Sequence, residues 1–334
     1  MIDEVYGTVL SVLNKNNYGY VTPADFNLFA TQAQLSIFED FFYSYNHQIN
    51  KENMRQSGIG YADLKSGIEQ DIAIFAKTQV LDQPTATANT ANIYNLPSDY
   101  YFVNKLYFYP TLLYSGTTTA EAAGKLVDTT ANQFVVTAPA VPESPPIGSI
   151  VINTSPTGAP TAPILTAYVT AVDSVSTLSL SADIMSTGAA PYVGQDYKIY
   201  NANNIVDIEK VSQYKIFNLT SSNLTAPTKT YPAYVLSEGV SETATIYPST
   251  INQKGDVVCQ YIRYPKTPKW TYNVVSATPL FNPTAVDYQD FEIPEDNMVD
   301  LVALILQYSG MSIREVEVYK FGATQDMNEK QSEQ

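Results

Sequence analysis

One long amphipathic helix, from Thr22 to about Ile49, most constrains what this chain can fold into. Thr22 can cap its start, Pro23 suits the first helical position, and the Asp25 carboxylate faces the positive end of the helix dipole. Apolar residues then recur at three- and four-residue steps, namely Phe26, Phe29, Ala30, Ala33, Ile37, Phe38, Phe41 and Tyr45. A rod of roughly 40 Å with such a stripe needs a partner to cover it.

Matching stripes lie at the two ends of the chain. Near the start, the periodic residues are Ile2, Val5, Tyr6, Val9, Leu10 and Leu13, and then Leu64, Ile68, Ile72 and Phe75. Near the end, a helix opens at Pro294-Glu295 with Met298, Leu301, Val302, Ile305 and Leu306 on one face. We expect Gly310 to close that helix and Ser312 to cap a last helix reaching Tyr319. These stripes predict a helical bundle built from both chain ends.

The middle of the chain has the pattern of strands and loops. From Thr111 to about Gln195 the composition shifts to Thr, Ala, Ser, Val and Pro, with short β runs at Phe134–Val136, Ile150–Ile152, Ala167–Val172 and Thr177–Leu180. Frequent Pro and Gly between short runs indicate a small barrel or sandwich. The predicted fold class is α+β: a helical part at 1–95, a β region at 96–290 with an inserted module at about 111–195, and C-terminal helices with a docking tail at 291–334.

Charge and composition limit the possible partners. The chain has 334 residues, 45% of them hydrophobic, and 18 basic against 33 acidic residues give a net charge of −15. Such a chain is poorly suited to grip a phosphate backbone, which needs clustered Lys and Arg. The 26 tyrosines suit protein interfaces as well as cores. The start lacks a secretion signal and the longest apolar run, Met298–Leu306, is too short to cross a bilayer, so we expect a cytoplasmic site of assembly and no membrane partner.

The residues that commonly carry out catalysis are scarce. Cys259 and His47 are the only cysteine and histidine. The cysteine lies in a β run, as a small core residue would, and the histidine lies near a helix end, where it would face solvent or offset the helix dipole. Five carboxylates cluster between residues 287 and 296 and could in principle bind calcium or act as acid and base, namely Asp287, Asp290, Glu292, Glu295 and Asp296. Their spacing matches no metal loop, so charges at a helix start are the favoured interpretation. No enzyme activity, cofactor or metal is predicted.

Four stretches of the sequence resemble a known family. They are Gly19–Phe42 (GYVTPADFNLFATQAQLSIFEDFF), the Leu96–Tyr100 turn (LPSDY), the segment Pro227–Trp270 with its Tyr-Pro pairs, and Phe291–Tyr319 with its two expected helices. Together they are similar to the head–tail adaptor (connector, or tail tubular) proteins of short-tailed bacteriophages, most closely those of crAss-like gut phages. The module from Thr111 to Gln195 lies outside the resemblance.

The resemblance implies a structural virion protein that forms a ring of about twelve copies beneath the portal. In that family the helices build the ring wall, the terminal helix and tail reach the portal, and the β part faces the next tail component, while double-stranded DNA passes through the channel without specific binding. We expect Arg314, Lys320 and the tail from Phe321 onward to contact the portal. The residues expected to pack the bundle and ring are Phe26, Phe29, Ile37, Phe41, Leu301 and Ile305.

Two other hypotheses stay open from the sequence. The chain could be another tail ring subunit that never contacts the portal. Alternatively, the Thr-rich module could bind a carbohydrate or hydrolyse one with two carboxylates.

Overall fold

The computed structural model divides the chain into two compact units, one made of Met1–Ala76 with Tyr264–Gln334 and the other of Lys77–Arg263. The structure describes residues 1–13, 21–55, 64–84, 92–120, 122–130, 134, 145–154, 165–185, 194–237, 242–275, 278–313, 320, 323–324 and 327. The chain is a mixed α+β protein. The units divide after Ala76 and after Arg263, whereas the sequence predicted boundaries at 95 and 290. The contacts described below explain the difference.

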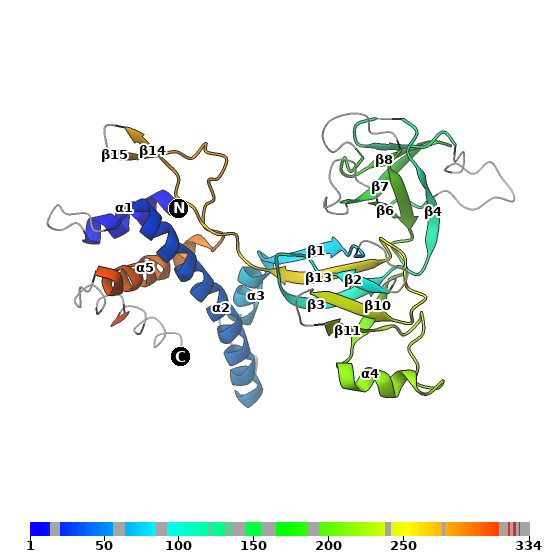
Figure 1. The fold of residues 1–334 in the computed structure, drawn as a ribbon, viewed down its shortest axis with the longest axis horizontal. Helices are drawn as coiled ribbons and strands as arrows, with labels where there is room; N and C mark the ends of the chain where they lie inside the picture. The colour runs from blue at the N-terminus through cyan, green and yellow to red at the C-terminus, as the bar shows by residue number, and fades with distance from the viewer. Residues whose placement is uncertain are drawn as a thin grey trace. The chain divides into compact units, whose positions relative to one another are not determined.

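Helices from both ends of the chain form most of the first unit (Figure 1). They are α1 (Ile2–Leu13), α2 (Pro23–Arg55), α3 (Leu64–Ala73) and α5 (Met298–Ile313), the last preceded by a single 3-10 turn, η1 (Glu295–Asn297). α2 packs on α3 and α5, and α1 packs on α5. The Thr22 hydroxyl accepts a hydrogen bond from the Asp25 backbone N–H at 3.2 Å, so the predicted cap of α2 is confirmed.

The stripe residues of these helices are largely covered. Phe26, Ile37, Phe41, Leu301 and Ile305 are buried, and Phe29 is half-buried. Contacts within a single copy therefore cover most of the apolar stripe of α2. Their role in packing a ring stays a prediction.

The predicted break at Gly310 is wrong. α5 runs without interruption through Gly310 and Ser312 to Ile313, with Gly310 itself buried. A glycine inside a helix costs only about 1 kcal/mol relative to alanine, which is less than a buried helical face gains by packing. Residues 314–319, where the last helix was expected, lie outside the described residues.

A curled seven-stranded sheet forms one part of the second unit. Its strands, in the order in which they lie, are β1 (Ala76–Val80), β13 (Val257–Arg263), β3 (Tyr100–Phe108), β10 (Val206–Lys210), β11 (Ala233–Ser237), β12 (Thr243–Tyr247) and β2 (Ile93–Asn95). Asp82, just beyond β1, forms an isolated bridge with Asn95 of β2, so the two edges of the sheet come together at that point. α4 (Gln213–Thr220) lies in the crossover between the parallel pair β10 and β11.

A second curled sheet accounts for the Thr-rich module. Its strands lie in the order β4 (Leu112–Thr117), β9 (Asp196–Tyr200), β6 (Ile150–Asn153), β7 (Leu165–Ser174), β8 (Thr177–Leu180) and β5 (Lys125–Val127). Ala120, three residues after β4, bridges Val127 of β5 at the opposite edge. Three of the four β runs predicted here are strands; of the fourth, Phe134 is buried and Val135–Val136 lie outside the described residues.

The module is inserted into one antiparallel strand pair of the larger sheet. Phe108, the last residue of β3, lies opposite Val206, the first residue of β10. At the base of the module, Leu112 of β4 similarly lies opposite Tyr200 of β9. The whole six-stranded sheet therefore occupies the position of a hairpin loop between β3 and β10.

Each sheet encloses its own core, and a third cluster joins the two. Inside the larger sheet lie side chains such as Tyr94, Leu106 and Cys259, and inside the smaller one lie Leu126, Val151 and Tyr197. Between the sheets pack Val80, Tyr109, Ile150, Ile152, Tyr200 and Val258. The module is thus a separate β layer with an apolar joint to its host sheet.

Candidate interaction surfaces

The two residues considered for nucleophilic catalysis occupy the environments that the sequence indicated. Cys259 is fully buried within the larger sheet, and burial raises the pKa of its thiol to about 12. A thiol with such a pKa is almost entirely protonated at neutral pH and makes a poor nucleophile. His47 is exposed on α2.

The acidic residues between 287 and 296 mostly have structural partners. The Asp287 carboxylate lies 2.6 Å from the Lys269 ammonium, whose hydrogen bond holds the pKa of Asp287 below its usual range. Asp290 accepts a hydrogen bond from the Ile2 backbone N–H at 2.8 Å and so caps the start of α1. Glu292 accepts one from the Lys266 backbone N–H at 2.7 Å. Among the residues that the structure describes, no group of three or more His, Cys, Asp or Glu is arranged to hold a metal ion.

These contacts belong to a segment, Tyr264–Pro294, that lies along the helices and that we call the strap. The buried Gln34 of α2 donates to the Lys266 carbonyl at 2.8 Å and accepts from the Glu292 backbone N–H at 3.1 Å. One side chain therefore ties both ends of the strap to α2. The strap was expected in the β region, but these contacts place it in the helical unit.

An aromatic cluster anchors the middle of the strap. The ring centroid of Trp270 lies 4.2 Å from that of Tyr6 on α1, and the ring centroid of Tyr6 lies 4.8 Å from that of Phe26 on α2. The Trp270 indole N–H donates to the Asp3 carboxylate at 2.9 Å. Aromatic contacts of this kind combine large apolar area with fixed geometry, so the strap and helices form one packed structure.

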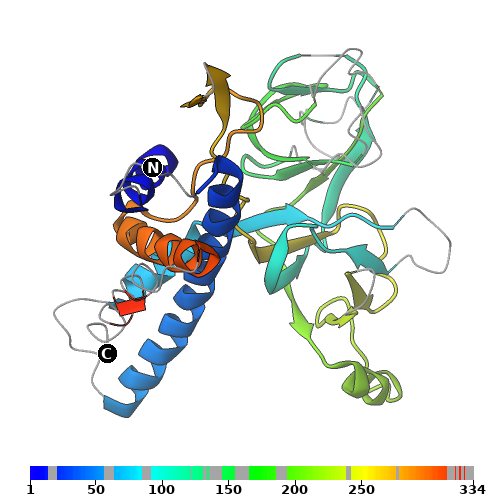
Figure 2. The ribbon, with the colours of Figure 1, turned by 60° about the vertical axis from the view of Figure 1, so that its left-hand side comes forward.

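A two-stranded hairpin extends from the strap next to Trp270. It consists of β14 (Tyr272–Val275) and β15 (Thr278–Phe281), and it stands out from the helices of its unit in two views (Figures 1 and 2). We call its four exposed apolar side chains, Tyr272, Val274, Val275 and Leu280, the hairpin surface; Val274 is 68% and Leu280 63% exposed. The rings of Tyr272 and Phe281 stack on Trp270 and anchor the base of the hairpin. The exposed apolar side chains of the hairpin indicate a docking element.

A second exposed apolar surface lies in the other unit. α4 buries Ile216 against Ala233 and Val235 of β11, with Leu219 half-buried beside it, and exposes its other side chains. We call residues Ser212–Pro232 the α4 lobe; its exposed large side chains are Tyr214, Phe217, Leu224 and Tyr231, of which Leu224 is 93% exposed. In Figure 1 α4 lies beyond β11, at the periphery of its unit. Four large apolar side chains on a short segment form a patch of the kind found at protein interfaces.

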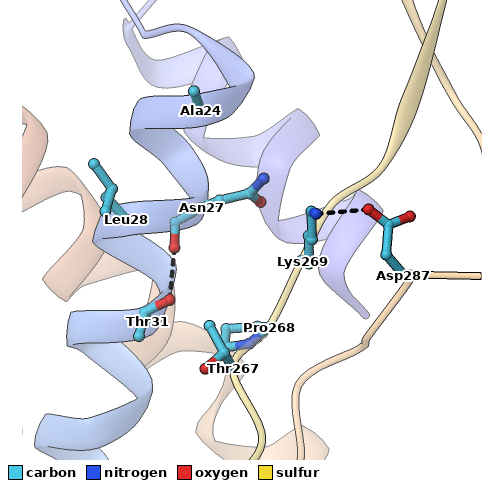
Figure 3. Close-up of a pocket in the computed structure, with 8 residues that line it drawn as sticks. All are labelled: Ala24, Asn27, Leu28, Thr31, Thr267, Pro268, Lys269 and Asp287. Atoms are coloured by element: carbon cyan, nitrogen blue, oxygen red, sulfur yellow. Dashed lines mark hydrogen bonds and ion pairs between the residues drawn. The ribbon is translucent and has the colours of Figure 1, made fainter.

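A shallow cavity of about 330 Å³ lies between α2 and the strap (Figure 3). Ala24, Asn27, Leu28 and Thr31 line it from α2, and Thr267, Pro268, Lys269 and Asp287 line it from the strap. The Lys269–Asp287 ion pair occupies one wall, so its charged groups already have partners. The cavity brings together no acid, base or nucleophile in a catalytic arrangement.

The structure describes only part of the expected portal-contact region. Lys320 is helical and exposed. Arg314 and Phe321 lie outside the described residues, so their expected role stays a prediction. In the described part of the chain, no helix is long and apolar enough to cross a membrane.

Both exposed apolar surfaces escaped the sequence analysis. Two short β runs separated by two residues signal a hairpin at 272–281, but the prolines nearby favoured an extended arm. Ile216 and Leu219 give α4 a helical spacing too short to stand out. A search with models of known protein families and a search of characterised proteins find no match to this chain.

Proposed function

We propose that this protein is a ring-forming head–tail adaptor of a short-tailed bacteriophage, which docks on the portal, extends the DNA channel and presents a platform for the next tail component. The observation that carries the proposal is the presence of two different exposed apolar surfaces, the hairpin surface and the α4 lobe, on separate units of one chain. The resemblance of four sequence stretches to such adaptors supports it.

Two unlike surfaces suit a subunit with neighbours on more than one side. In a ring, each copy contacts the next head to tail, so the two contact surfaces of a copy differ. Exposed apolar patches on a single chain are covered in such an assembly. A monomeric enzyme needs a cleft with reactive groups instead, and the cavity described above offers a single ion pair.

The charge of the chain supports a DNA conduit. A net charge of −15 repels the phosphate backbone, so a passing duplex would not adhere to the wall. In this proposal the helices from both chain ends form a bundle that builds the ring wall. Arg314, Lys320 and the tail from Phe321 onward contact the portal, and the protein resides in the virion.

A pull-down with purified portal tests the proposal and separates it from the alternative of a tail ring subunit that never contacts the portal. We expect the full chain to bind portal in the absence of other tail proteins. Deletion of residues 321–334 should weaken binding while leaving the circular dichroism spectrum and melting temperature unchanged. Full-length chain that binds only when another tail protein is present would support the alternative, and unchanged binding after the deletion would remove the tail from the contact.

A further inference from the structure

The α4 lobe and the residues directly beside it are locally basic in a chain that is otherwise acidic. The segment Lys210–Ser237 contains three lysines and no Asp or Glu, whereas the whole chain has a net charge of −15. Lys210, Lys215 and Lys229 are all exposed, and none of them forms an ion pair within the described part of the chain. The surface therefore combines free positive charge with the exposed side chains of Tyr214, Phe217, Leu224 and Tyr231.

A partner for this surface must offer acidic groups next to exposed apolar groups. Burying the aromatic side chains supplies the affinity of such a contact, and opposite charges around them fix its register and raise the association rate. The Lys215 ammonium lies 5.9 Å from the centroid of the Tyr214 ring, so the positive charge lies beside the aromatic surface.

The helical unit carries a surface with that complementary chemistry. We define the acidic face as Asp71 of α3, Ile74 in the turn directly after α3, Glu295 and Asp296 of η1, and Val299 of α5. Ile74 is 48% and Val299 52% exposed. The three acids form no ion pair with any residue that the structure describes. Burial and the nearby charge of Asp296 both raise the pKa of Asp71, so two like charges lie close together here.

We propose that the α4 lobe of one copy binds the acidic face of a second copy. Three unpaired lysines beside exposed aromatic side chains match three unpaired acids beside exposed aliphatic ones. The proposal rests on the adaptor function proposed above, because it supplies the head-to-tail contact that closes a ring. It also gives the acidic face a positive counter-charge, which no ion pair within the described part of the chain supplies.

Nucleic acid is the less suitable occupant of the lobe. Affinity for a phosphate backbone comes from many clustered Lys and Arg contacts, and this segment holds three lysines and no arginine. A second copy brings acidic and apolar groups together in one surface. DNA binding by the lobe is therefore treated as an outcome that overturns the proposal.

A charge-exchange experiment tests the contact on the full chain. One variant reverses the lobe (Lys210→Glu with Lys215→Glu), a second reverses the acidic face (Asp71→Lys with Asp296→Lys), and a third combines all four changes. Lys229 is left in place because its charge also acts on the half-buried Asp256. A control, Lys105→Glu with Lys125→Glu, makes the same net charge change at two lysines outside the lobe, each of which pairs with an aspartate of its own sheet.

Sedimentation velocity at several protein and salt concentrations is the measurement. We expect each reversed variant to self-associate about tenfold more weakly than wild type or worse, and the combined variant to regain wild-type association to within about threefold. The control should associate like wild type, and circular dichroism should show that all variants fold. Association of wild type should weaken as salt rises.

Other results would overturn the contact. If wild type assembles and both reversed variants assemble equally well, the contact is wrong while the adaptor function stands. If the wild-type chain stays monomeric even at high concentration, the copy-to-copy contact is wrong, and the adaptor function then depends on the portal pull-down alone. If short duplex DNA binds wild type in fluorescence anisotropy and the lobe variant loses that binding, the lobe takes nucleic acid instead.

Discussion

The side-chain amide of Asn27 is hydrogen-bonded to both backbone polar groups of Trp270. The Trp270 N–H donates to the Asn27 Oδ1 at 2.8 Å, and the Asn27 Nδ2 donates to the Trp270 carbonyl at 3.2 Å. The amide thus replaces the neighbouring strand that the strap lacks at this position. Because the Trp270 side chain is buried against Tyr6, its backbone groups have little access to water, and pairing them is worth more than an exposed hydrogen bond.

We predict that Asn27→Ala destabilises the helical unit by about 1–3 kcal/mol, because two backbone groups near a buried tryptophan lose their partner. Chemical denaturation followed by tryptophan fluorescence measures this directly, since Trp270 is the only tryptophan. Asn46→Ala is the matched control, because Asn46 is exposed on the same helix. Equal stability of the two variants would show that the bonds to Trp270 contribute nothing.

The sequence predicted the helices but gave no signal for contacts between segments that are far apart in the chain. The spacing of Phe26, Ile37 and Phe41 predicted α2, because an apolar stripe reports directly which face is buried. The strap contacts could not be predicted, because they pair a single Gln34 or Asn27 with backbone groups more than 200 residues away. Such bonds depend on the fold being already formed and leave no periodic signal.

The inserted module likewise combines local features that could be predicted with a long-range pairing that could not. Its short β runs predicted strands, but the place of insertion follows from Phe108 lying opposite Val206, a pairing that spans about a hundred residues of intervening chain. The two exposed surfaces were missed because an exposed Leu224 or Val274 looks, in sequence, like an ordinary core residue.

We predict that Gly116→Ala disrupts the smaller sheet. A Cβ at Gly116 would lie 2.6 Å from the Asp128 Oδ2 and 2.8 Å from the Tyr197 hydroxyl, which are the two ends of one buried hydrogen bond. The bond must break or the strand must shift, at a cost of roughly 1–3 kcal/mol. The melting temperature should fall measurably.

Gly7→Ala is the control for that change. Nothing lies within 4 Å of a Cβ at Gly7, which is exposed within α1, so alanine there should stabilise the protein by roughly 0.5–1 kcal/mol. A Gly116→Ala variant that is as stable as wild type would mean that β4 adjusts freely at this position.

Excision of the module should leave its host sheet folded. Replacing residues 109–205 with an Asn-Gly turn joins Phe108 to Val206 in the register that they already have. The loss of the joint exposes Val80 and Val258, which costs roughly 3–6 kcal/mol in total. The buried Cys259 reports the outcome: slow thiol labelling shows an intact sheet, and immediate full labelling would show that the sheet needs the module.

Asp256, at the joint between the two sheets, should make stability depend on pH. Its carboxylate accepts a hydrogen bond from the Tyr200 hydroxyl and lies 3.5 Å from the Lys198 ammonium, with the Lys229 charge also acting on it. Burial outweighs these partners and raises the pKa of Asp256 above its ordinary value of 3.8. The stability that this group contributes is therefore complete below pH 3.8 and is lost as the pH rises through the raised pKa.

Asp256→Asn tests this sign. Asparagine keeps an acceptor for Tyr200 but does not titrate, so the free energy of unfolding of the variant relative to wild type should rise as the pH increases from 3.8 and then level off. Urea denaturation at a series of pH values measures the difference. A difference that falls over the same range would show that Lys198 and Tyr200, rather than burial, dominate the environment of Asp256.

The most direct test of the proposed adaptor function is the mass of the complex formed when the purified chain is mixed with purified portal, measured by mass photometry and followed by negative-stain imaging. We predict a particle heavier than the portal by about twelve copies of the chain, seen as an added ring on one end of the portal. A portal that keeps its own mass beside single copies of the chain, at concentrations well above those in an infected cell, would contradict the adaptor function.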